Sequence, residues 1–206
     1  CERNRRTRQA MDACREQVRT AREEFSLIKR QRTELFMRAY THIANRIDGV
    51  YKELTRSRTA PMGGVAYLSV EDSDVRNKTN QEPYNTGISY HAMPPMKRFR
   101  DMEQLSGGEK TMAALALLFA IHTFHPAPFF VLDEVDAALY ALLTSDAHNV
   151  ASVSDYIRAH ASERFQFIVI SLKASLYERS QGLVGIFRDG TRRSSACVTL
   201  DLEQYS

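Results

Sequence analysis

The amino-acid sequence predicts an α/β fold, in which helices cover a mainly parallel sheet and one long helix leads into it. Two observations predict this fold. Residues 1–58 contain no proline and one glycine, and their apolar side chains recur at helical spacing. From Gly107 onward, helical segments alternate with short apolar runs, a pattern typical of sheets covered by helices. The sequence therefore indicates two domains, an arm at 1–58 and a body at 59–206.

The arm carries two apolar stripes that are offset by one residue. The first stripe repeats every three or four residues, at Met11, Cys14, Val18, Ala21, Phe25, Ile28, Arg32 and Leu35. The second consists of Phe36, Tyr40, Ile43, Ile47, Val50 and Leu54. We interpret the first stripe as a coiled-coil seam and the second as the root of the arm on the body. A single amphipathic helix packed on its own domain is the alternative.

The body is expected to begin where the helix breakers at 59–64 end the arm. Strands are then expected at 65–70, 87–91, 128–133, 165–170, 183–187 and 195–202. Helices are expected at 107–123, 149–161 and 173–180.

The charge of the chain is distributed unevenly. The net charge is +3, but residues 1–58 hold 15 Lys and Arg against 8 Asp and Glu, so the arm is basic and the body is acidic. A basic arm is compatible with nearby nucleic acid, and equally with a solvated helix surface. No apolar run approaches the length needed to span a membrane, so no membrane partner is expected. The chain begins at Cys1, which indicates a segment of a longer protein.

A serine and two glycines open the helix expected at 107–123. Ser106 with Glu109 three residues later has the spacing of a capping box. Capping alone does not explain Gly107 and Gly108, since glycine in a helix costs about 1 kcal/mol relative to alanine. A phosphate packed against the first amides would require such a bare backbone.

Two carboxylates end the apolar strand at 128–133. Asp133 and Glu134 lie at its C-terminal end, where open α/β sheets bind ligands. Nucleotide hydrolysis needs one acid to hold Mg²⁺ and another group to position or deprotonate the attacking water. Asp133 suits the first role and Glu134 the second, whereas a pair of solvated acids is the simpler alternative. A phosphate-binding GxxxxGK[ST] loop does not occur in the chain.

These residues resemble the C-terminal half of an ABC-type ATPase head in the SMC (structural maintenance of chromosomes) family. The run 105–110 resembles the ABC signature motif, and 129–134 resembles a Walker B motif with its catalytic glutamate. The arm resembles the returning helix of the SMC coiled coil. The segments YHAMPPMKRFRDMEQLSGGEKT, HPAPFFVLDEVDAAL and FIVISLK look most like the first-subunit type of cohesin SMC proteins.

The resemblance implies that two heads engage face to face and enclose two ATP molecules. The signature motif, Leu105, Ser106, Gly107, Gly108 and Glu109, would then contact ATP held by the partner, the third cohesin SMC subunit. Asp133 would bind Mg²⁺ and Glu134 would act as the catalytic residue on ATP held by the protein's own N-terminal head lobe. The resemblance also implies a kleisin C-terminal domain and DNA as partners. It implies a role in sister-chromatid cohesion on chromosomes in the nucleus.

The chain departs from the family pattern at two places. The stretch 140–145 looks inserted before Asp146, at the loop that signals between the two sites. Leu172 stands where many relatives carry a switch histidine, and leucine here resembles the cohesin type.

The basic residues Lys97, Arg98 and Arg100 are candidates for DNA contact.

Two other hypotheses stay open on the sequence alone. The inserted stretch favours a kleisin-binding scaffold with a weak ATPase site. A coiled-coil ATPase of recombination or repair would share the same motifs.

Overall fold

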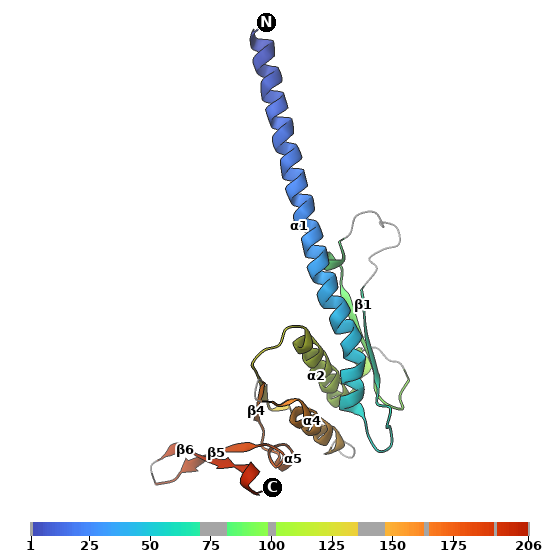
Figure 1. Ribbon diagram of the computed structural model, residues 1–206. Helices are drawn as coiled ribbons and strands as arrows, with labels where there is room; N and C mark the ends of the chain where they lie inside the picture. The colour runs from blue at the N-terminus through green and yellow to red at the C-terminus, as the bar shows by residue number, and fades with distance from the viewer. Residues whose placement is uncertain are drawn as a thin grey trace. The chain divides into compact units, whose positions relative to one another are not determined.

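The computed structural model describes residues 2–70, 82–98, 102–135, 147–162, 165–191 and 193–205. Figure 1 shows the elements in chain order, beginning with the long helix α1. The helices are α1 (Glu2–Thr55), α2 (Gly107–Phe124), α4 (Ala147–His160) and α5 (Ala174–Tyr177), with short 3-10 turns at Pro83–Asn85, Met102–Gln104 and Leu202–Tyr205. The strands are β1 (Val65–Val70), β2 (Ile88–Met93), β3 (Phe129–Asp133), β4 (Gln166–Ile170), β5 (Gly182–Asp189) and β6 (Ser194–Asp201). The alternation of helices and strands predicted from Gly107 onward is confirmed.

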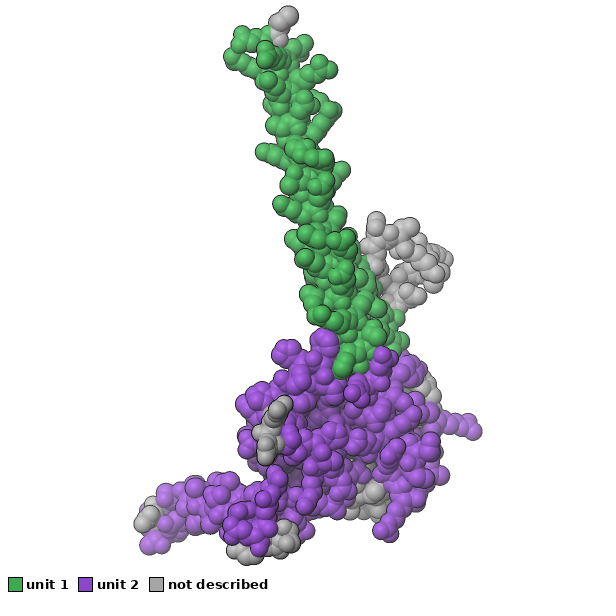
Figure 2. Space-filling model, in the orientation of Figure 1, with its two compact units in different colours: residues 1–44, 68–89 green, residues 45–67, 90–206 purple. Residues whose placement is uncertain are grey.

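The chain divides into two compact units, coloured separately in Figure 2. The first comprises residues 1–44 and 68–89, and the second comprises residues 45–67 and 90–206. The boundary between a domain at 1–58 and one at 59–206 stays a prediction.

In the first unit, side chains of α1 hold the segment that precedes β2. Lys29 forms an ion pair with Glu82, and the Arg32 guanidinium lies 4.2 Å from the centre of the Tyr84 ring. The hydroxyl of Tyr40 donates a hydrogen bond to the carbonyl of Leu68 at 3.1 Å. The apolar members of the first stripe are exposed in this chain, as shown by Met11, Val18, Phe25, Ile28 and Leu35. Their exposure leaves the seam open to a further helix, and the coiled coil itself stays a prediction.

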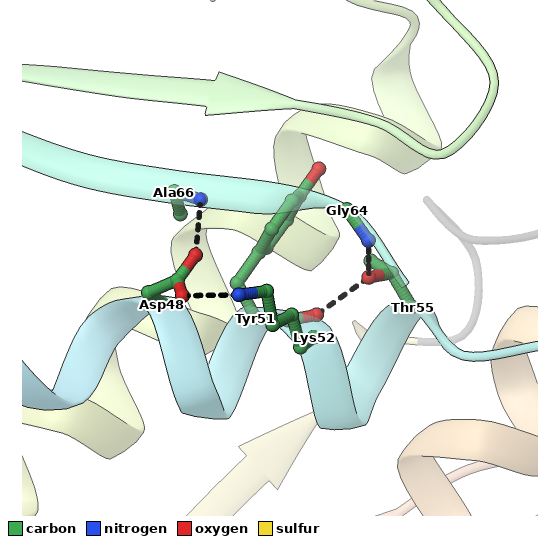
Figure 3. A network of polar contacts seen from close by, with 6 residues as sticks. All are labelled: Asp48, Tyr51, Lys52, Thr55, Gly64 and Ala66. Carbon is green, nitrogen blue, oxygen red and sulfur yellow. Dashed lines mark hydrogen bonds and ion pairs between the residues drawn. The ribbon is translucent and has the colours of Figure 1, made fainter. Parts of the chain in front are cut away.

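In the second unit, the last turns of α1 are buried. Ile47, Val50 and Leu54 lie in the core, which confirms the root predicted from the second stripe. Figure 3 shows how this root is tied to the segment that enters β1. A carboxylate oxygen of Asp48 accepts a hydrogen bond from the amide of Ala66 at 3.2 Å, and its other oxygen lies 2.5 Å from Lys52 Nζ.

The same root includes a close backbone approach. Thr55 Oγ1 donates to the carbonyl of Tyr51 at 2.6 Å and accepts from the amide of Gly64 at 2.8 Å. A Cβ at Gly64 would lie 2.5 Å from the carbonyl oxygen of Met93 and 2.6 Å from Cε1 of Tyr51. Only glycine fits between these atoms. Gly63 before it has φ +69°, a conformation that L side chains rarely adopt.

The strands form three separate two-stranded sheets in the described part of the chain. β3 and β4 are parallel, with Phe130 opposite Phe167 and Asp133 opposite Ile170. β5 and β6 form an antiparallel pair, and β1 pairs with β2. The prediction of one mainly parallel sheet is therefore wrong, because apolar runs identify strands without identifying their neighbours. The mixed α/β class is confirmed.

The parallel pair β3–β4 has one covered face and one open face. On the covered face, the Phe119 ring of α2 stacks on Tyr156 of α4 with centroids 4.6 Å apart. It also meets Phe130 of β3 and Phe167 of β4 edge-on. Because side chains alternate along a strand, the other face carries the neighbouring residues. Their apolar members are all exposed: Phe129, Val131, Ile168 and Ile170.

Candidate functional site

A capping box closes the start of helix α2. The backbone of Ser106 is extended, with φ −64° and ψ 161°. Its Oγ accepts a hydrogen bond from the amide of Glu109 at 3.3 Å, and Glu109 Oε2 accepts one from the amide of Ser106 at 2.9 Å. The capping box predicted from the spacing is confirmed. Since Oγ is the acceptor in this box, the hydroxyl hydrogen of Ser106 can still be donated to another group.

The first helical residue, Gly107, faces open space. A Cβ built on Gly107 would meet no heavy atom within 4 Å in the described chain. Packing inside the chain therefore does not require glycine at this position, although glycine lowers the stability of the helix. Gly108, by contrast, is buried, as is Leu105 before the cap. The first turn of α2 is thus packed against the chain at Leu105 and Gly108 and is open to solvent at Gly107.

Glu109 is held by a second cation outside the capping box. Lys97 Nζ lies 2.6 Å from its Oε1. Partial burial raises the pKa of Glu109, but the hydrogen bonds from Lys97 and Ser106 outweigh it, so the net pKa lies below its ordinary value of 4.5. The carboxylate that caps α2 is therefore ionised at neutral pH, and its charge is stabilised by the positive end of the helix.

The lowered pKa of Glu109 predicts an acid-dependent loosening of this turn. A carboxyl whose pKa is lower in the folded state stabilises the fold above its ordinary value of 4.5, and this contribution is lost as pH falls through the lowered pKa. We expect Glu109→Gln to reduce hydrogen-exchange protection of the bonded amides of Ser106, Glu109 and Lys110 at neutral pH, by about 0.3–1 kcal/mol. The difference from wild type should vanish as pH falls below 4.5, measured on the full-length protein with rates corrected for intrinsic exchange.

Glu103→Gln is the matched control for this experiment, because Glu103 is an exposed acid in the turn just before the motif. A difference between wild type and Glu109→Gln that persists unchanged at low pH would contradict the assignment of the protection to the Glu109 charge.

The two predicted carboxylates lie at the C-terminal edge of the parallel pair. Asp133 is the last residue of β3 and is opposite Ile170, the last residue of β4. Glu134 follows at once, and its amide donates to the carbonyl of Ile170 at 3.0 Å. Both acids are exposed. The structure thus places Asp133 and Glu134 at the end of β4, and Leu172, two residues after β4 ends, is 91% exposed.

Glu134 has an unusual backbone for its residue type. Its φ is +49°, in the left-handed region that is uncommon for residues other than glycine, asparagine and aspartate. The hydrogen bond to Ile170 holds this conformation at the strand end. Strained backbone of this kind is concentrated at functional sites, where it fixes the direction of a side chain.

The structure does not join the two motifs. Among the residues that it describes, no hydrogen bond or ion pair links Ser106 to Asp133 or Glu134. The stretch 140–145 and Asp146 lie outside the described residues, as does Arg100. Within the described ranges no group of three His, Cys, Asp or Glu side chains gathers to hold a metal ion. No described helix is long and apolar enough to cross a membrane.

The sequence did not predict the contacts of two residues next to the signature-like motif. Lys97, one of the basic residues that are candidates for DNA contact, places its ammonium against Glu109. Tyr51 of α1 is fully buried, and its hydroxyl has no hydrogen-bond partner in the described chain. Burial raises the pKa of Tyr51, and the negative charge of Glu109 raises it further. A lysine twelve residues before a glutamate gives no sequence signal for such a pair.

A comparison with protein families matches residues 14–195 to the family model described as the RecF/RecN/SMC N terminal domain. This match contradicts the expectation that the chain is a C-terminal head lobe. The order of two motifs in a segment does not reveal which end of a longer protein the segment comes from.

Several curated proteins are similar to this chain. Structural maintenance of chromosomes protein 1 from Schizosaccharomyces pombe is 54% identical over 193 residues, covering 94% of this chain. The protein of the same name from Arabidopsis thaliana is 50% identical over 190 residues, covering 86% of this chain. The chain spans 15% and 14% of the lengths of these two relatives.

Solved structures of SMC heads are similar as well. The Smc head domain from Pyrococcus furiosus, with an extended coiled coil and bound to the C-terminal domain of ScpA, has a TM-score of 0.71 and 32% identity. The match covers 89% of this chain and 40% of that one. A structure concerned with ATP-driven dimerization and DNA-stimulated activation of SMC ATPases has a TM-score of 0.65 and 32% identity, covering 84% of this chain and 92% of that one. The fold of the chain is that of an SMC ATPase head.

Proposed function

The chain belongs to the RecF/RecN/SMC family, and from that premise we propose that it supplies half of an ATP-hydrolysing site in a cohesin-type SMC head. The observation that carries the proposal is the pair Asp133 and Glu134, exposed at the C-terminal edge of β3–β4. Glu134 is held there with a positive φ by its bond to Ile170. ATP is bound by the part of the head that contains the phosphate loop absent from this sequence.

Asp133 and Glu134 divide the chemistry of hydrolysis between them. An exposed carboxylate at a strand edge fits Mg²⁺, which binds proteins through one or two carboxylates and completes its shell with water and substrate phosphates. When bound, Mg²⁺ supplies positive charge that offsets the charge of the transferring phosphoryl group. Asp133 would hold it through a carboxylate oxygen. Glu134 orients the attacking water in line with the γ-phosphate and accepts its proton.

Ser106 acts on a different ATP, the one held by the partner head. Its Oγ accepts the bond from Glu109, so its hydroxyl hydrogen is available for donation to an external acceptor. The open space at Gly107 lets a phosphate approach the first amides of α2, where the helix dipole favours negative charge. This division agrees with the absence of any bond between Ser106 and the two acids in the described residues.

Substituting Ser106 tests this role. Ser106→Asp keeps a good N-cap residue but replaces the donated hydrogen by a negative charge that repels phosphate. We expect it to lower hydrolysis at the partner's site about 100-fold to 1000-fold, a typical effect of losing one donor to a developing charge. The assay measures single-turnover hydrolysis of ATP at the partner's site in the full-length heterodimer, with own-site hydrolysis blocked by Glu134→Gln, so that release from the engaged state does not enter the rate. Ser106→Thr retains the hydroxyl and serves as the matched control.

Protection of the α2 amides should survive in Ser106→Asp. Unaltered turnover at the partner's site in that variant would exclude phosphate contact by Ser106.

The open face of β3–β4 supports a head completed by another segment. Its exposed apolar side chains are typical of a parallel sheet that is buried on both faces: Phe129, Val131, Ile168 and Ile170. We infer that the part of the head bearing the phosphate loop packs here and delivers ATP to Asp133 and Glu134.

The wider role rests on the relatives. Names of curated proteins at 50–54% identity support the first-subunit type over a recombination or repair ATPase. By this reading the partner head is the third cohesin SMC subunit, and the protein acts with DNA in sister-chromatid cohesion and chromosome organisation in the nucleus. A related head bound to the C-terminal domain of ScpA supports a kleisin C-terminal domain as a further partner.

The inserted stretch 140–145 favours one alternative, a kleisin-binding scaffold with a weak site of its own. The scaffold would bind kleisin without appreciable turnover. In a complex whose other site is already inactive, loss of the remaining ATPase activity on substituting Glu134 would exclude it.

A further inference from the structure

A strained turn lies just ahead of the signature motif. The amide of Lys97 donates to the carbonyl of Pro94 at 3.3 Å, which closes a four-residue turn with Pro95 and Met96 at its centre. Met96 has φ +59°, where turns of this kind normally place glycine or asparagine. Its side chain is 86% exposed, so packing of the methionine does not hold the conformation. Lys97 is the last residue of this turn, so the turn fixes where the Lys97 backbone lies.

Lys97 completes the contacts of the Glu109 carboxylate. Its Nζ lies 2.6 Å from Oε1, while Oε2 accepts the amide hydrogen of Ser106 at 2.9 Å. Each oxygen of the carboxylate therefore has its own partner. The side chain of Glu109 is 18% exposed and that of Lys97 is 55% exposed, so the pair is anchored at the motif and open at the lysine.

Stability alone is a poor reason for this pair. Ion pairs with one exposed partner contribute little to folding, because solvent screens them and ordering two long side chains is costly. The capping box also closes without Lys97, since Glu109 reaches Ser106 directly. A carboxylate with one partner can rotate about its last bond, where the torsional preference is broad. The second contact removes that freedom.

We propose that Lys97 is a positioning residue for the signature serine, holding Ser106 through Glu109 in the orientation that phosphate contact requires. The inference rests on the proposed function of Ser106 at the partner's ATP. Lys97 touches no nucleotide in this scheme. It acts on the direction of the Ser106 hydroxyl, which is set by the two bonds of the capping box.

The test measures single-turnover hydrolysis at the partner's site over a range of ATP concentrations in the full-length heterodimer, with the site of this protein silenced by Glu134→Gln. We expect Lys97→Ala to lower the maximal single-turnover rate, taken here as kcat, by roughly tenfold to a hundredfold, as expected from a slightly misplaced group. The KM for ATP should stay unchanged, because the nucleotide is bound by the partner's own residues. Lys97→Arg should restore most of the turnover, since it keeps the charge and the reach to Glu109.

Two controls separate positioning from other effects. Arg188→Ala removes one exposed positive charge from β5 and should leave turnover unchanged. Hydrogen exchange of the bonded amides of Ser106, Glu109 and Lys110 should be nearly the same in Lys97→Ala as in wild type. An equal loss of turnover in Arg188→Ala would attribute the effect to net charge and overturn the proposal. Loss of the amide protection in Lys97→Ala would attribute the loss of turnover to unfolding of α2, and this result would also overturn the proposal.

The proposal and the function on which it rests fail in different ways. If Ser106→Asp leaves turnover at the partner's site unaltered, the role of Ser106 is wrong and the positioning role falls with it. If Ser106→Asp abolishes turnover while Lys97→Ala keeps the wild-type kcat, Ser106 contacts the phosphate and Lys97 does not position it.

Discussion

Replacing Glu134 with glutamine should reduce hydrolysis at this protein's own site by about 100-fold to 10,000-fold, the range contributed by a positioned general base. Glutamine keeps the shape of the side chain and can still orient water, but it cannot accept the proton. ATP binding depends on other residues, so the variant should accumulate ATP and remain in the engaged state. Single-turnover hydrolysis, together with cross-linking between the two heads, measures both effects.

The assay for Glu134→Gln needs the full heterodimer, with the partner's own site silenced so that only one site turns over. Glu24→Gln provides the matched control, because it makes the same chemical change at an exposed position of α1. Hydrolysis at the wild-type rate in Glu134→Gln would remove Glu134 from the mechanism. Loss of nucleotide binding in the same variant would show that Glu134 contributes to ATP affinity and not to the hydrolysis step.

The second large effect is expected at Gly64, where alanine should destabilise the root of α1 by about 1–3 kcal/mol, as overpacking typically does. The new Cβ would lie 2.5 Å from the Met93 carbonyl oxygen and 2.6 Å from Tyr51 Cε1, and a backbone carbonyl cannot rotate away. The strain should loosen the bonds that tie α1 to β1. Faster hydrogen exchange at the amide of Ala66, which donates to Asp48, reports this locally.

Gly49→Ala is the control for Gly64→Ala, because a Cβ there meets nothing within 4 Å and the residue lies inside α1. Alanine should stabilise the helix at Gly49 by up to about 1 kcal/mol. Equal exchange at Ala66 in wild type and Gly64→Ala would contradict the close approach.

Local patterns predicted the elements well, because each depends on residues near in sequence. The capping box of α2 follows from Ser106 and Glu109 alone, and the root of α1 follows from the spacing of Ile47, Val50 and Leu54. The pairing of the strands could not be predicted, since an apolar run such as Phe129–Asp133 identifies a strand but not the strands beside it. The expectation of a C-terminal head lobe was wrong for a similar reason, since motif order within the chain does not distinguish it from the N terminal domain that the family model describes.

Within the candidate site, the sequence indicated the residues to which we assign the chemistry and missed the contacts that set their geometry. Asp133 and Glu134 could be named because acids after an apolar run are a local signal. The positive φ of Glu134 could not, since glutamate rarely adopts that conformation and a tertiary bond to Ile170 enforces it. Tyr51 belongs to neither stripe of the arm, so its burial beside Gly64 was not foreseen.

The open face of β3–β4 has a consequence for how the protein is made. In the described chain each of these strands has only one neighbour, so the pair presents unpaired edges beside exposed Phe129, Val131 and Ile168. Apolar strands with free edges are templates for aggregation. We therefore expect residues 1–206 produced alone to precipitate more readily than the same residues co-expressed with a segment that covers this face.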